Sequence, residues 1–257
     1  MIKKIQETEC LSTYDSSHLD QLVLVEEVHF WFKHRRDYIC RVFDQFVDKN
    51  ARILEIGGGT GYIASQLSAL GFHVELSDMH ANGLRYAQKR GIAKVYQLDL
   101  FDSPFEADFD VICLFDVLEH LHDPTRALQC IKKMLKPRGL IILTVPTHGW
   151  LWSRDDRIAG HQKRYTKEIL RQEFNSAGVN PLYMRYFFSA ILPFLLMRRW
   201  LKRDDGTPLK TNEETSWHLP RWMNRFFDVW MFMERVLPKW AGGSLIAIAQ
   251  NTPSDDK

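Results

Sequence analysis

Short apolar runs alternate with amphipathic stretches through the middle of the chain, from residue 51 to residue 180. The runs are rich in β-branched residues, which predicts strands at 51–56, 72–77, 93–98, 109–115 and 139–145. Between them, helical spacing of apolar positions predicts helices at 60–70, 81–90 and 124–135, followed by a helix end and a turn at 135–139. Near-continuous apolar strands separated by helices are typical of a parallel sheet covered on both faces. The pattern therefore predicts a doubly wound α/β domain.

The two flanking regions lack this alternation. Residues 1–50 have apolar positions at three- and four-residue spacing, which predicts helices. The segment 181–240 carries 13 aromatic side chains, and GSLIAIAQ (243–250) is strand-like. We therefore expect an N-terminal helical cap at 1–50, the α/β core at 51–180, an aromatic helical insertion or lid at 181–242, and the last strand with the tail at 243–257.

Composition and charge narrow the function classes. The 257 residues include 34 Lys and Arg against 32 Asp and Glu, a balance that gives no reason to expect a nucleic-acid partner. Cys10, Cys40, Cys113 and Cys130 lie far apart without a C-x-x-C pair, which predicts reduced thiols rather than a disulfide framework or a zinc site. The N-terminus has two lysines but no apolar run after them, so no signal peptide is expected. These features together predict a cytoplasmic protein.

The most informative segment is LEIGGGTGYIA (54–64), which joins the first predicted strand to the first predicted helix. It has the spacing E-x-G-x-G-x-G, beginning at Glu55. A dinucleotide-binding loop wants its third small residue at the position of Tyr62, and a P-loop needs a lysine, which is absent from 50–88. The glycines therefore predict close approach of the backbone to a ligand that carries no pyrophosphate.

With this loop the chain resembles the class I S-adenosylmethionine-dependent methyltransferases, in which the same glycine pattern wraps the methionine part of the cofactor. The resemblance implies a Rossmann-like, mostly parallel sheet of seven strands, and S-adenosyl-L-methionine as the cofactor. It also implies that Asp78, after the second strand, binds the ribose hydroxyls, and that Asp99, after the third, contacts the adenine amine. The implied cofactor-binding residues are Glu55, Gly57, Gly59, Gly61, Asp78, Met79, Asp99, Leu100, Phe115, Asp116, Phe32 and Arg35.

These assignments agree with simple chemistry, although each residue taken singly also fits a purely structural role. A carboxylate can accept both hydroxyls of a ribose, and an acid in the loop suits a sulfonium cation. An Asp at a strand end is, however, equally typical of a helix N-cap or a turn. EEVHFWFKHRR (26–36) resembles a cell-envelope and polysaccharide-linked branch of the family and implies a helix that covers the cofactor through Trp31, Phe32 and Arg35. A helix that merely packs on the sheet is the alternative.

Candidate catalytic residues follow the fourth predicted strand, where ligands of open α/β sheets gather. Methyl transfer needs a base only when the acceptor keeps a proton. Many small-molecule O-methyltransferases of the family have an E-H pair here, so the resemblance makes His120 the first candidate, with Glu119 beside it and oxygen as the acceptor atom. His120 could instead pack or cap the next helix. An alternative metal site of His120, His122 and Asp123 is weakly supported, and no metal is expected.

A second cluster lies in residues 146–170, where G-H-x-x-R-Y-T (160–166) resembles the same cell-envelope branch. Loops at this sheet edge usually carry function, so we expect His161 to be catalytic and Arg164, Tyr165 and Trp150 to bind the acceptor. Arg164 with Arg154 or Arg157 could hold an anionic group. Alternatively, the charged residues 154–157 pair with one another at the surface.

The segment 181–203 carries five basic residues and no acid around an apolar run. That run is too short to span a bilayer, which takes about 20 residues. Three interpretations stay open: a lid over a hydrophobic acceptor pocket with a dimer contact, a packed helical subdomain, and an element at 187–203 that rests on an anionic membrane.

The sequence therefore predicts an S-adenosylmethionine-dependent methyltransferase, monomeric or homodimeric, that acts at oxygen on a small-molecule or a lipid- or sugar-linked acceptor. It would work in the cytoplasm, with contact to the inner face of the membrane as an open alternative. An NAD(P)-linked oxidoreductase is the rival enzyme, against which Tyr62 argues. A methyltransferase-like binding protein without turnover is the third hypothesis.

Overall fold

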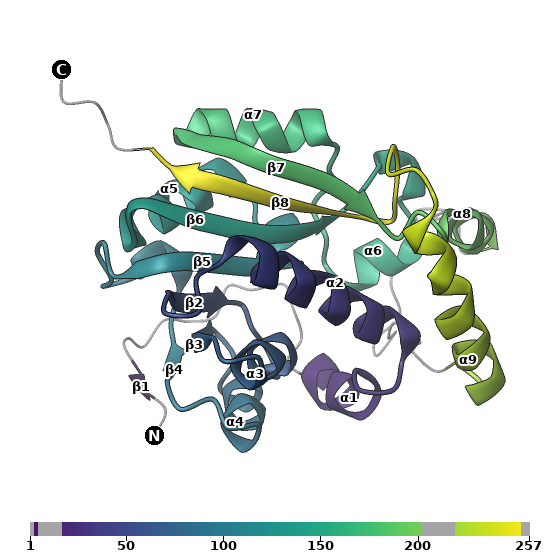
Figure 1. Cartoon of the computed structure of the whole chain (residues 1–257), viewed down its shortest axis with the longest axis horizontal. Helices are drawn as coiled ribbons and strands as arrows, with labels where there is room; N and C mark the ends of the chain where they lie inside the picture. Colours follow the sequence, from purple (N-terminus) through teal and green to yellow (C-terminus); the bar gives the residue numbers. More distant parts are fainter. Residues whose placement is uncertain (1–2, 5–16, 202–218, 253–257) are drawn as a thin grey trace.

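The computed structural model describes residues 3–4, 17–201 and 219–252, which form one mixed sheet with helices on both faces (Figure 1). The sheet has eight strands in the order β1-β4-β3-β2-β5-β6-β8-β7. The strands are β1 (Lys3–Lys4), β2 (Arg52–Ile56), β3 (His73–Asp78), β4 (Val95–Gln97), β5 (Phe109–Phe115), β6 (Leu135–Pro146), β7 (Val179–Phe187) and β8 (Ser244–Asn251). All pairs from β1 to β6 are parallel, whereas β8 runs antiparallel to both β6 and β7. The doubly wound, mostly parallel sheet is confirmed, with a two-residue edge strand added.

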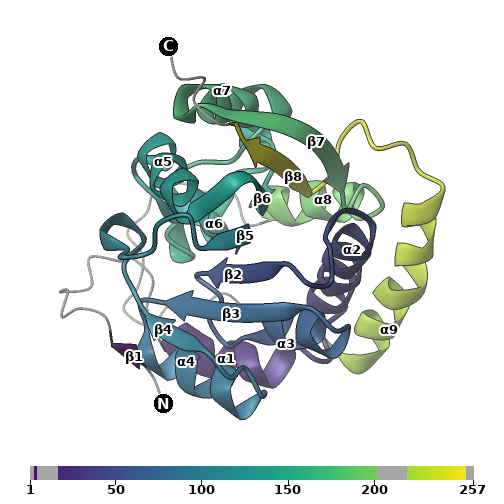
Figure 2. The same cartoon turned by 60° about the vertical axis from the view of Figure 1, so that its left-hand side comes forward.

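Helices cover both faces and explain the unbroken apolar strands (Figure 2). One face carries α2 (Phe30–Phe46), α3 (Tyr62–Ala69) and α4 (Ala81–Lys89), and the other carries α5 (Pro124–Met134) and α7 (Lys167–Ala177). Alternate residues of β5 enter different cores: Val111 and Cys113 pack with the α2 side, Ile112 and Leu114 with the α5 side. Because successive strand side chains point to opposite faces, a strand buried on both faces is apolar throughout.

Two predicted boundaries differ from the structure. β7 crosses the expected domain boundary at residue 180, so the sheet extends to Phe187. The strand overlaps the predicted aromatic insertion and contains Pro181, which is unusual inside a sheet. β7 tolerates this proline because it is an edge strand with a register shift at that point. A turn was expected at 135–139, but β6 already begins at Leu135, which pairs with Phe109, and the bend is made by Arg138 at φ 63°.

The remaining helices are α1 (Ser17–Val25), α6 (Arg154–Ile158), α8 (Leu192–Leu201), α9 (Arg221–Trp230) and the short 3₁₀ segments η1 (Leu100–Asp102), η2 (Leu118–His120), η3 (Gly149–Leu151) and η4 (Met231–Arg235). The helix α9 lies along α2, where Phe227 stacks on Phe30 at 4.6 Å, and Phe194 of α8 packs against Phe227 at 5.1 Å between ring centroids (Figure 1). The insertion is thus built onto the N-terminal helical cap. Within the described ranges, each helix is too short or too polar to cross a bilayer.

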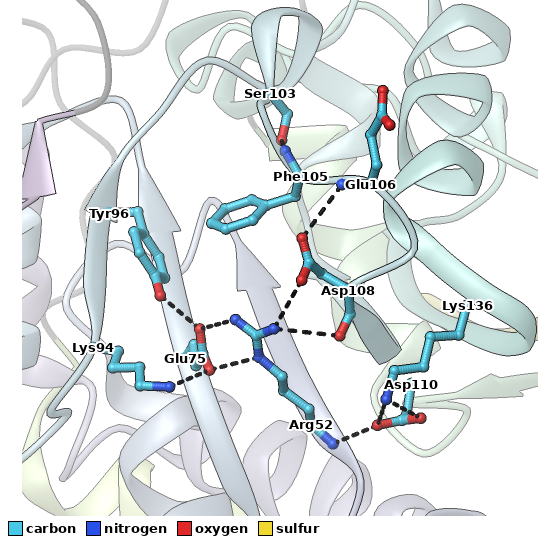
Figure 3. A network of polar contacts seen from close by, with 10 residues as sticks. All are labelled: Arg52, Glu75, Lys94, Tyr96, Ser103, Phe105, Glu106, Asp108, Asp110 and Lys136. Carbon is cyan, nitrogen blue, oxygen red and sulfur yellow. Dashed lines mark hydrogen bonds and ion pairs between the residues drawn. The ribbon is translucent and has the colours of Figure 1, made fainter.

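A polar network closes the amino-terminal edge of the central strands (Figure 3). Glu75 of β3 is buried and accepts hydrogen bonds from Arg52, Lys94 and Tyr96 at 2.7–3.2 Å. Burial raises the pKa of Glu75, but these donors outweigh it and bring the pKa down to about 2. The network faces away from the glycine loop, so its role is to hold β2, β3 and β4 in register.

Candidate active site

The glycine loop leaves β2 in backbone conformations that favour glycine. Gly57 has φ 67° and its N–H donates to Ser77 O at 2.8 Å, which ties the loop to β3. Gly61 has φ 75° and is the N-cap of α3. A Cβ there would lie 2.7–2.8 Å from the Cβ and Cα atoms of Ala87, so α3 and α4 can approach this closely only around a glycine. The loop therefore presents backbone without side chains at the carboxyl end of β2, where a ligand can approach it closely.

Glu55 lies at the base of this loop as a buried carboxyl group. Desolvation raises its pKa to about 8, against a smaller lowering by the nearby Arg35. Its Oε2 has no hydrogen-bond partner in the described part of the chain. A buried acid that is mostly neutral at pH 7 and has one unpartnered oxygen is suited to pair with an arriving cation.

The two predicted aspartates already hold backbone groups. Asp78 is buried and accepts from Gly59 N and His80 N, both at 2.8 Å, so it shapes the glycine loop directly. Burial raises its pKa. Asp99 caps η1 by accepting from Phe101 N at 2.9 Å, which is the capping role considered as the alternative. Each carboxylate oxygen has a second lone pair, so these bonds leave acceptor capacity for a ligand hydroxyl or amine.

The neighbouring candidates flank these acids. Leu100 and Phe115 are buried in the two cores, and Met79 is partly exposed after β3 with its carbonyl held by Gln97 at 3.1 Å. Phe32 of α2 is also buried, with its ring edge-on to His29 at 5.7 Å. The Phe32 ring is thus part of the apolar core on the α2 side of the sheet.

Arg35 connects the N-terminal cap to the end of β5. Its Nη2 lies 3.0 Å from Oδ2 of Asp116, and Thr144 of β6 donates to Oδ1 of the same carboxylate at 2.7 Å. Asp116 has a φ of 56°, so the chain turns sharply there. Arg35 Nε is buried without a hydrogen-bond partner among described residues. The guanidinium therefore has an unused donor at Nε, and its charge also acts on Glu55.

The N-terminal cap also covers the glycine loop. Leu19 of α1 lies 3.2 Å from the position of a Cβ on Gly59. Glu26, which is buried, accepts from the Thr60 hydroxyl at 2.8 and 3.0 Å and pairs with Arg90 of α4. Burial raises the pKa of Glu26, and Arg90 and Thr60 counteract it. The cap is thereby fixed over the loop by polar contacts that the apolar pattern of residues 1–50 did not reveal.

The predicted catalytic residues come together at the carboxyl end of β5. Glu119 and His120 of η2 and His161 of the loop after α6 each offer a ligand atom, all within 4.8 Å of one another. Glu119 is fully buried, and neither carboxylate oxygen has a hydrogen-bond partner in another described residue. Burial raises the pKa of Glu119 and, together with the neighbouring His161, lowers that of His120 to about 4. His120 is therefore uncharged at pH 7, and burial favours the protonated form of Glu119.

Asp156 is a candidate site residue that the sequence analysis did not single out. It is buried, and its Oδ1 lies 2.8 Å from Nδ1 of His161. Arg164 binds the same carboxylate through Nε at 2.8 Å and Nη2 at 3.0 Å, and its Nη1 donates to Thr147 O at 3.1 Å. Burial raises the pKa of Asp156, but these partners outweigh it and bring the pKa down to about 2.

These contacts bear on both expectations for Arg164 and the charged residues 154–157. Arg164 is committed to Asp156, and Asp155 pairs with Arg198 of α8 at 2.9 Å. The sequence signal for a buried Asp156 was the S-x-x-D capping box from Ser153, in which Asp156 accepts from Ser153 N at 2.9 Å.

The two remaining acceptor candidates differ in accessibility. Tyr165 is fully buried, and its hydroxyl donates to Leu118 O at 3.3 Å, so the structure places it in the packing of the loop. Trp150 is 46% exposed and stacks on His148 with ring centroids 4.8 Å apart. Trp150 therefore presents an open aromatic face on the same loop as His161.

The arrangement of donors also fits a divalent cation. Two imidazoles and a carboxylate are typical ligands of zinc and of other first-row metal ions. The bond from His161 Nδ1 to Asp156 leaves Nε2 as the ligand atom, and a carboxylate behind a histidine is a common support of metal sites. The metal trio considered from the sequence is not assembled, because Asp123 caps α5 through Arg126 N and His122 is exposed.

Comparisons with known proteins agree with this geometry. A family model of the methyltransferase domain matches residues 31–183. A ubiquinone biosynthesis O-methyltransferase of Xanthomonas oryzae pv. oryzae is 27% identical over 117 residues, which cover 43% of this chain and 48% of that protein. The match thus spans about half the length of that curated relative.

Solved structures share the fold over nearly the whole chain. A chain from the complex between the Haloferax volcanii Trm112 methyltransferase activator and a methyltransferase has a TM-score of 0.61 at 15% identity, covering 94% of this chain and 96% of that one. A methyltransferase dependent on S-adenosylmethionine from Thermotoga maritima has a TM-score of 0.58 at 15% identity, covering 92% and 95%. The family match alone covers more than half of the sequence, and the chain therefore belongs to the methyltransferase-domain family of class I S-adenosylmethionine-dependent methyltransferases.

Proposed function

We propose that this protein transfers the methyl group of S-adenosyl-L-methionine to a hydroxyl oxygen of a small or lipid-linked acceptor. The observation that carries the proposal is the position of Glu119, His120 and His161 beside the glycine loop. β5 is the direct neighbour of β2, and a Cβ on Gly57 would lie 2.7 Å from Val117, two residues before Glu119. The oxygen acceptor is also supported by the name of the Xanthomonas relative, a ubiquinone biosynthesis O-methyltransferase.

The cofactor half of the site would use the loop and three acids. When bound, S-adenosylmethionine supplies a methyl carbon activated by positive sulfur, and the sulfur leaving group needs no proton from an acid. Glu55 would ionise next to the positive charges of the methionine part. Arg35 would direct its Nε–H toward the carboxylate of that methionine part. Asp78 would accept the ribose hydroxyls, and Asp99 the adenine amine beside Leu100.

The acceptor half would handle the hydroxyl proton. Asp156 keeps the proton of His161 on Nδ1, so the lone pair of Nε2 is available toward Glu119 and His120. In this arrangement His161 would take the acceptor proton as the C–O bond forms and the C–S bond to the methyl group breaks, with the electron pair returning to sulfur. The negative Asp156 would stabilise the resulting imidazolium. Burial of the cluster excludes water, which would otherwise compete for the proton and for the acceptor position.

A ligand-binding and turnover experiment tests this proposal. S-adenosylhomocysteine should raise the melting temperature and NAD should not, because only a ligand of the native state stabilises it. Labelled methyl groups from S-adenosylmethionine should then enter phenolic or lipid-linked hydroxyl compounds, and His161→Ala should lower that rate about 100- to 10,000-fold. Cofactor binding without any incorporation across such acceptors would favour a binding protein instead. A melting temperature raised by NAD alone would favour the oxidoreductase.

A cation-assisted version of the same reaction is favoured by one observation, the unpartnered buried carboxylate of Glu119. A divalent cation held by Glu119, His120 and His161 would satisfy both of its oxygens, and it would lower the pKa of an acceptor hydroxyl. Chelation separates the two versions. If a cation is used, removing it should lower wild-type turnover to the level of Glu119→Gln, and adding it back should restore only the wild type. If His161 acts alone, a chelator should leave the wild-type rate unchanged.

We place the reaction in the cytoplasm. Cys40, Cys113 and Cys130 are free thiols, which supports a reducing compartment. Thiol labelling in intact cells would test this, since oxidation of these cysteines would argue for an exported protein.

A further inference from the structure

The helical insertion exposes an unusual number of large apolar side chains. Trp200, Trp222 and Trp240 are 77%, 72% and 85% exposed, respectively. We use the name aromatic surface for the exposed apolar residues of α8, α9, η4 and the segment that follows: Leu196, Met197, Trp200, Leu201, Trp222, Phe226, Val229, Trp230, Phe232, Met233, Val236 and Trp240. Isolated exposed apolar residues are ordinary, but a dozen on adjoining helices indicate a surface with a partner.

Helix α9 is apolar on two separate faces. Phe227 is buried in the core and attaches the helix to Phe30 of α2, and Met231, which follows the helix, is buried in the same core. Trp222, Phe226 and Val229 follow one another at four- and three-residue spacing, so they line a different face that is open to solvent. Phe226 touches Phe194 of α8 at 6.3 Å between ring centroids, but most of the Trp222 and Val229 side chains stays open to solvent.

The charges that accompany this surface are cationic. Arg221, Arg225 and Arg235 are exposed, and none has an ion-pair partner within the described residues. The acids on the same elements are already neutralised, because Asp228 pairs with Lys33 of α2 and Glu234 pairs with Lys239. The excess positive charge therefore lies beside the exposed aromatic rings, which is the arrangement that complements an anionic lipid surface.

We propose that the aromatic surface docks on an anionic phospholipid bilayer. Tryptophan and phenylalanine rings of α8, α9 and η4 would enter the boundary between headgroups and acyl chains, while Arg221, Arg225 and Arg235 contact lipid phosphates. A second copy of this chain is a poorer occupant, since a symmetric contact would bring the unneutralised arginine-rich surface against its own copy.

The docked surface adjoins the acceptor side of the site. Helix α8 packs on η3, which carries Trp150, and Arg198 of α8 binds Asp155, next to Asp156. If the proposed function holds, an acceptor with an apolar tail would reach His161 while its tail stays in the bilayer. The docking itself does not depend on that function.

Vesicle binding tests the proposal on the full-length protein without any acceptor. Wild type should sediment with phosphatidylcholine vesicles that contain phosphatidylglycerol, but much less with pure phosphatidylcholine, and binding should weaken as salt increases. Its tryptophan fluorescence should shift to the blue and be quenched by brominated acyl chains. The double variant Arg221→Glu/Arg225→Glu should lower the partition coefficient by at least about fivefold for each arginine. Trp222→Ser/Phe226→Ser should remove most binding even at low salt.

Matched controls separate docking from misfolding. Leu182→Ser on the exposed part of β7 and Arg171→Glu on α7 change the same kinds of exposed residue on elements outside the aromatic surface and should bind vesicles like wild type. Stabilisation by S-adenosylhomocysteine should be the same in all variants, which would show that the core is intact. The proposal fails if wild type ignores anionic vesicles, if the two double variants bind as well as the controls, or if sedimentation shows a dimer that Trp222→Ser/Phe226→Ser dissociates.

Discussion

Oδ1 of Asp156 lies 2.8 Å from Nδ1 of His161, in the segment that follows β6. The carboxylate is charged, because Arg164 and His161 hold its pKa at about 2 despite its burial. A charged acceptor at this distance fixes the tautomer of the imidazole and the orientation of its ring. The orientation of His161 is therefore set by the protein before any acceptor arrives.

Replacing Asp156 by Asn should impair turnover without impairing cofactor binding. The amide would offer His161 a neutral partner and could stabilise the wrong tautomer, so we expect kcat to fall about 10- to 100-fold with little change in the affinity for S-adenosylhomocysteine. Asp155→Asn is the matched control, since Asp155 pairs with Arg198 instead. Equal losses in the two variants, or a parallel loss of cofactor affinity, would assign Asp156 a purely structural role.

Cofactor binding should release a proton from Glu55. Its ordinary pKa of 4.5 is raised to about 8 by burial, so the group is mostly protonated at pH 7 in the free protein. A positively charged ligand favours the ionised form, and its affinity should therefore increase with pH and level off above about 8. Calorimetry at pH 7 in buffers of different ionisation enthalpy should detect the release of up to one proton. Glu55→Gln should abolish that buffer dependence; an unchanged proton count would assign the release to another group.

Gly61→Ala should cost more than Gly71→Ala. Both residues have positive φ, 75° and 89°, so both substitutions carry the left-handed penalty of about 1–2 kcal/mol. Only at Gly61 would the new Cβ also lie within 2.8 Å of Ala87, whereas nothing lies within 4 Å at Gly71. Urea unfolding should show the larger loss for Gly61→Ala, accompanied by weaker binding of S-adenosylhomocysteine. Equal unfolding midpoints would mean that α4 moves away at no cost.

Stability should fall at acid pH partly through Glu75. Its pKa is lowered from 4.5 to about 2 in the native protein, so its contribution is complete above about 4.5 and is lost as pH falls toward 2. Glu75→Gln should destabilise the protein by about 1–3 kcal/mol at pH 7, because buried donors lose a charged acceptor, and should flatten the decline below pH 4.5. Chemical unfolding across this range measures both effects. Glu106→Gln, at an exposed position, is the control. If the free energy of unfolding falls as steeply with pH in Glu75→Gln as in Glu106→Gln, the network is not the cause.

Much of the fold follows from local patterns. The run FDVICLF coincides with β5, because a strand buried on both faces needs an apolar side chain at nearly every position. Strands at the edge of the sheet were harder to predict. β7 contains Pro181, and its apolar residues do not alternate regularly with polar ones, so its sequence gives no clear strand signal. Its assignment comes from pairing with β8, more than fifty residues later.

The site was predictable where a motif is contiguous and less so where it is assembled. The glycine loop and the Glu119-His120 pair lie within short segments, so their spacing indicated their place at the sheet edge. Asp156 depends on contacts with two residues farther along the loop, and a charged run such as Arg154–Arg157 is usually exposed to solvent. Burial of one acid within it is a tertiary property that spacing alone does not reveal.

The segment that carries His148, Trp150 and His161 is fastened at its base. Thr147 bridges to Tyr165, and the backbone of Gln162 donates to Glu119 O at 2.7 Å. The residues between those attachments form η3 and α6 and supply neither a strand of the sheet nor a residue of the glycine loop, so many of them can be exchanged without altering either. Because the segment at 148–161 is separate from the glycine loop, related proteins could change their acceptor during evolution and keep the same methyl donor.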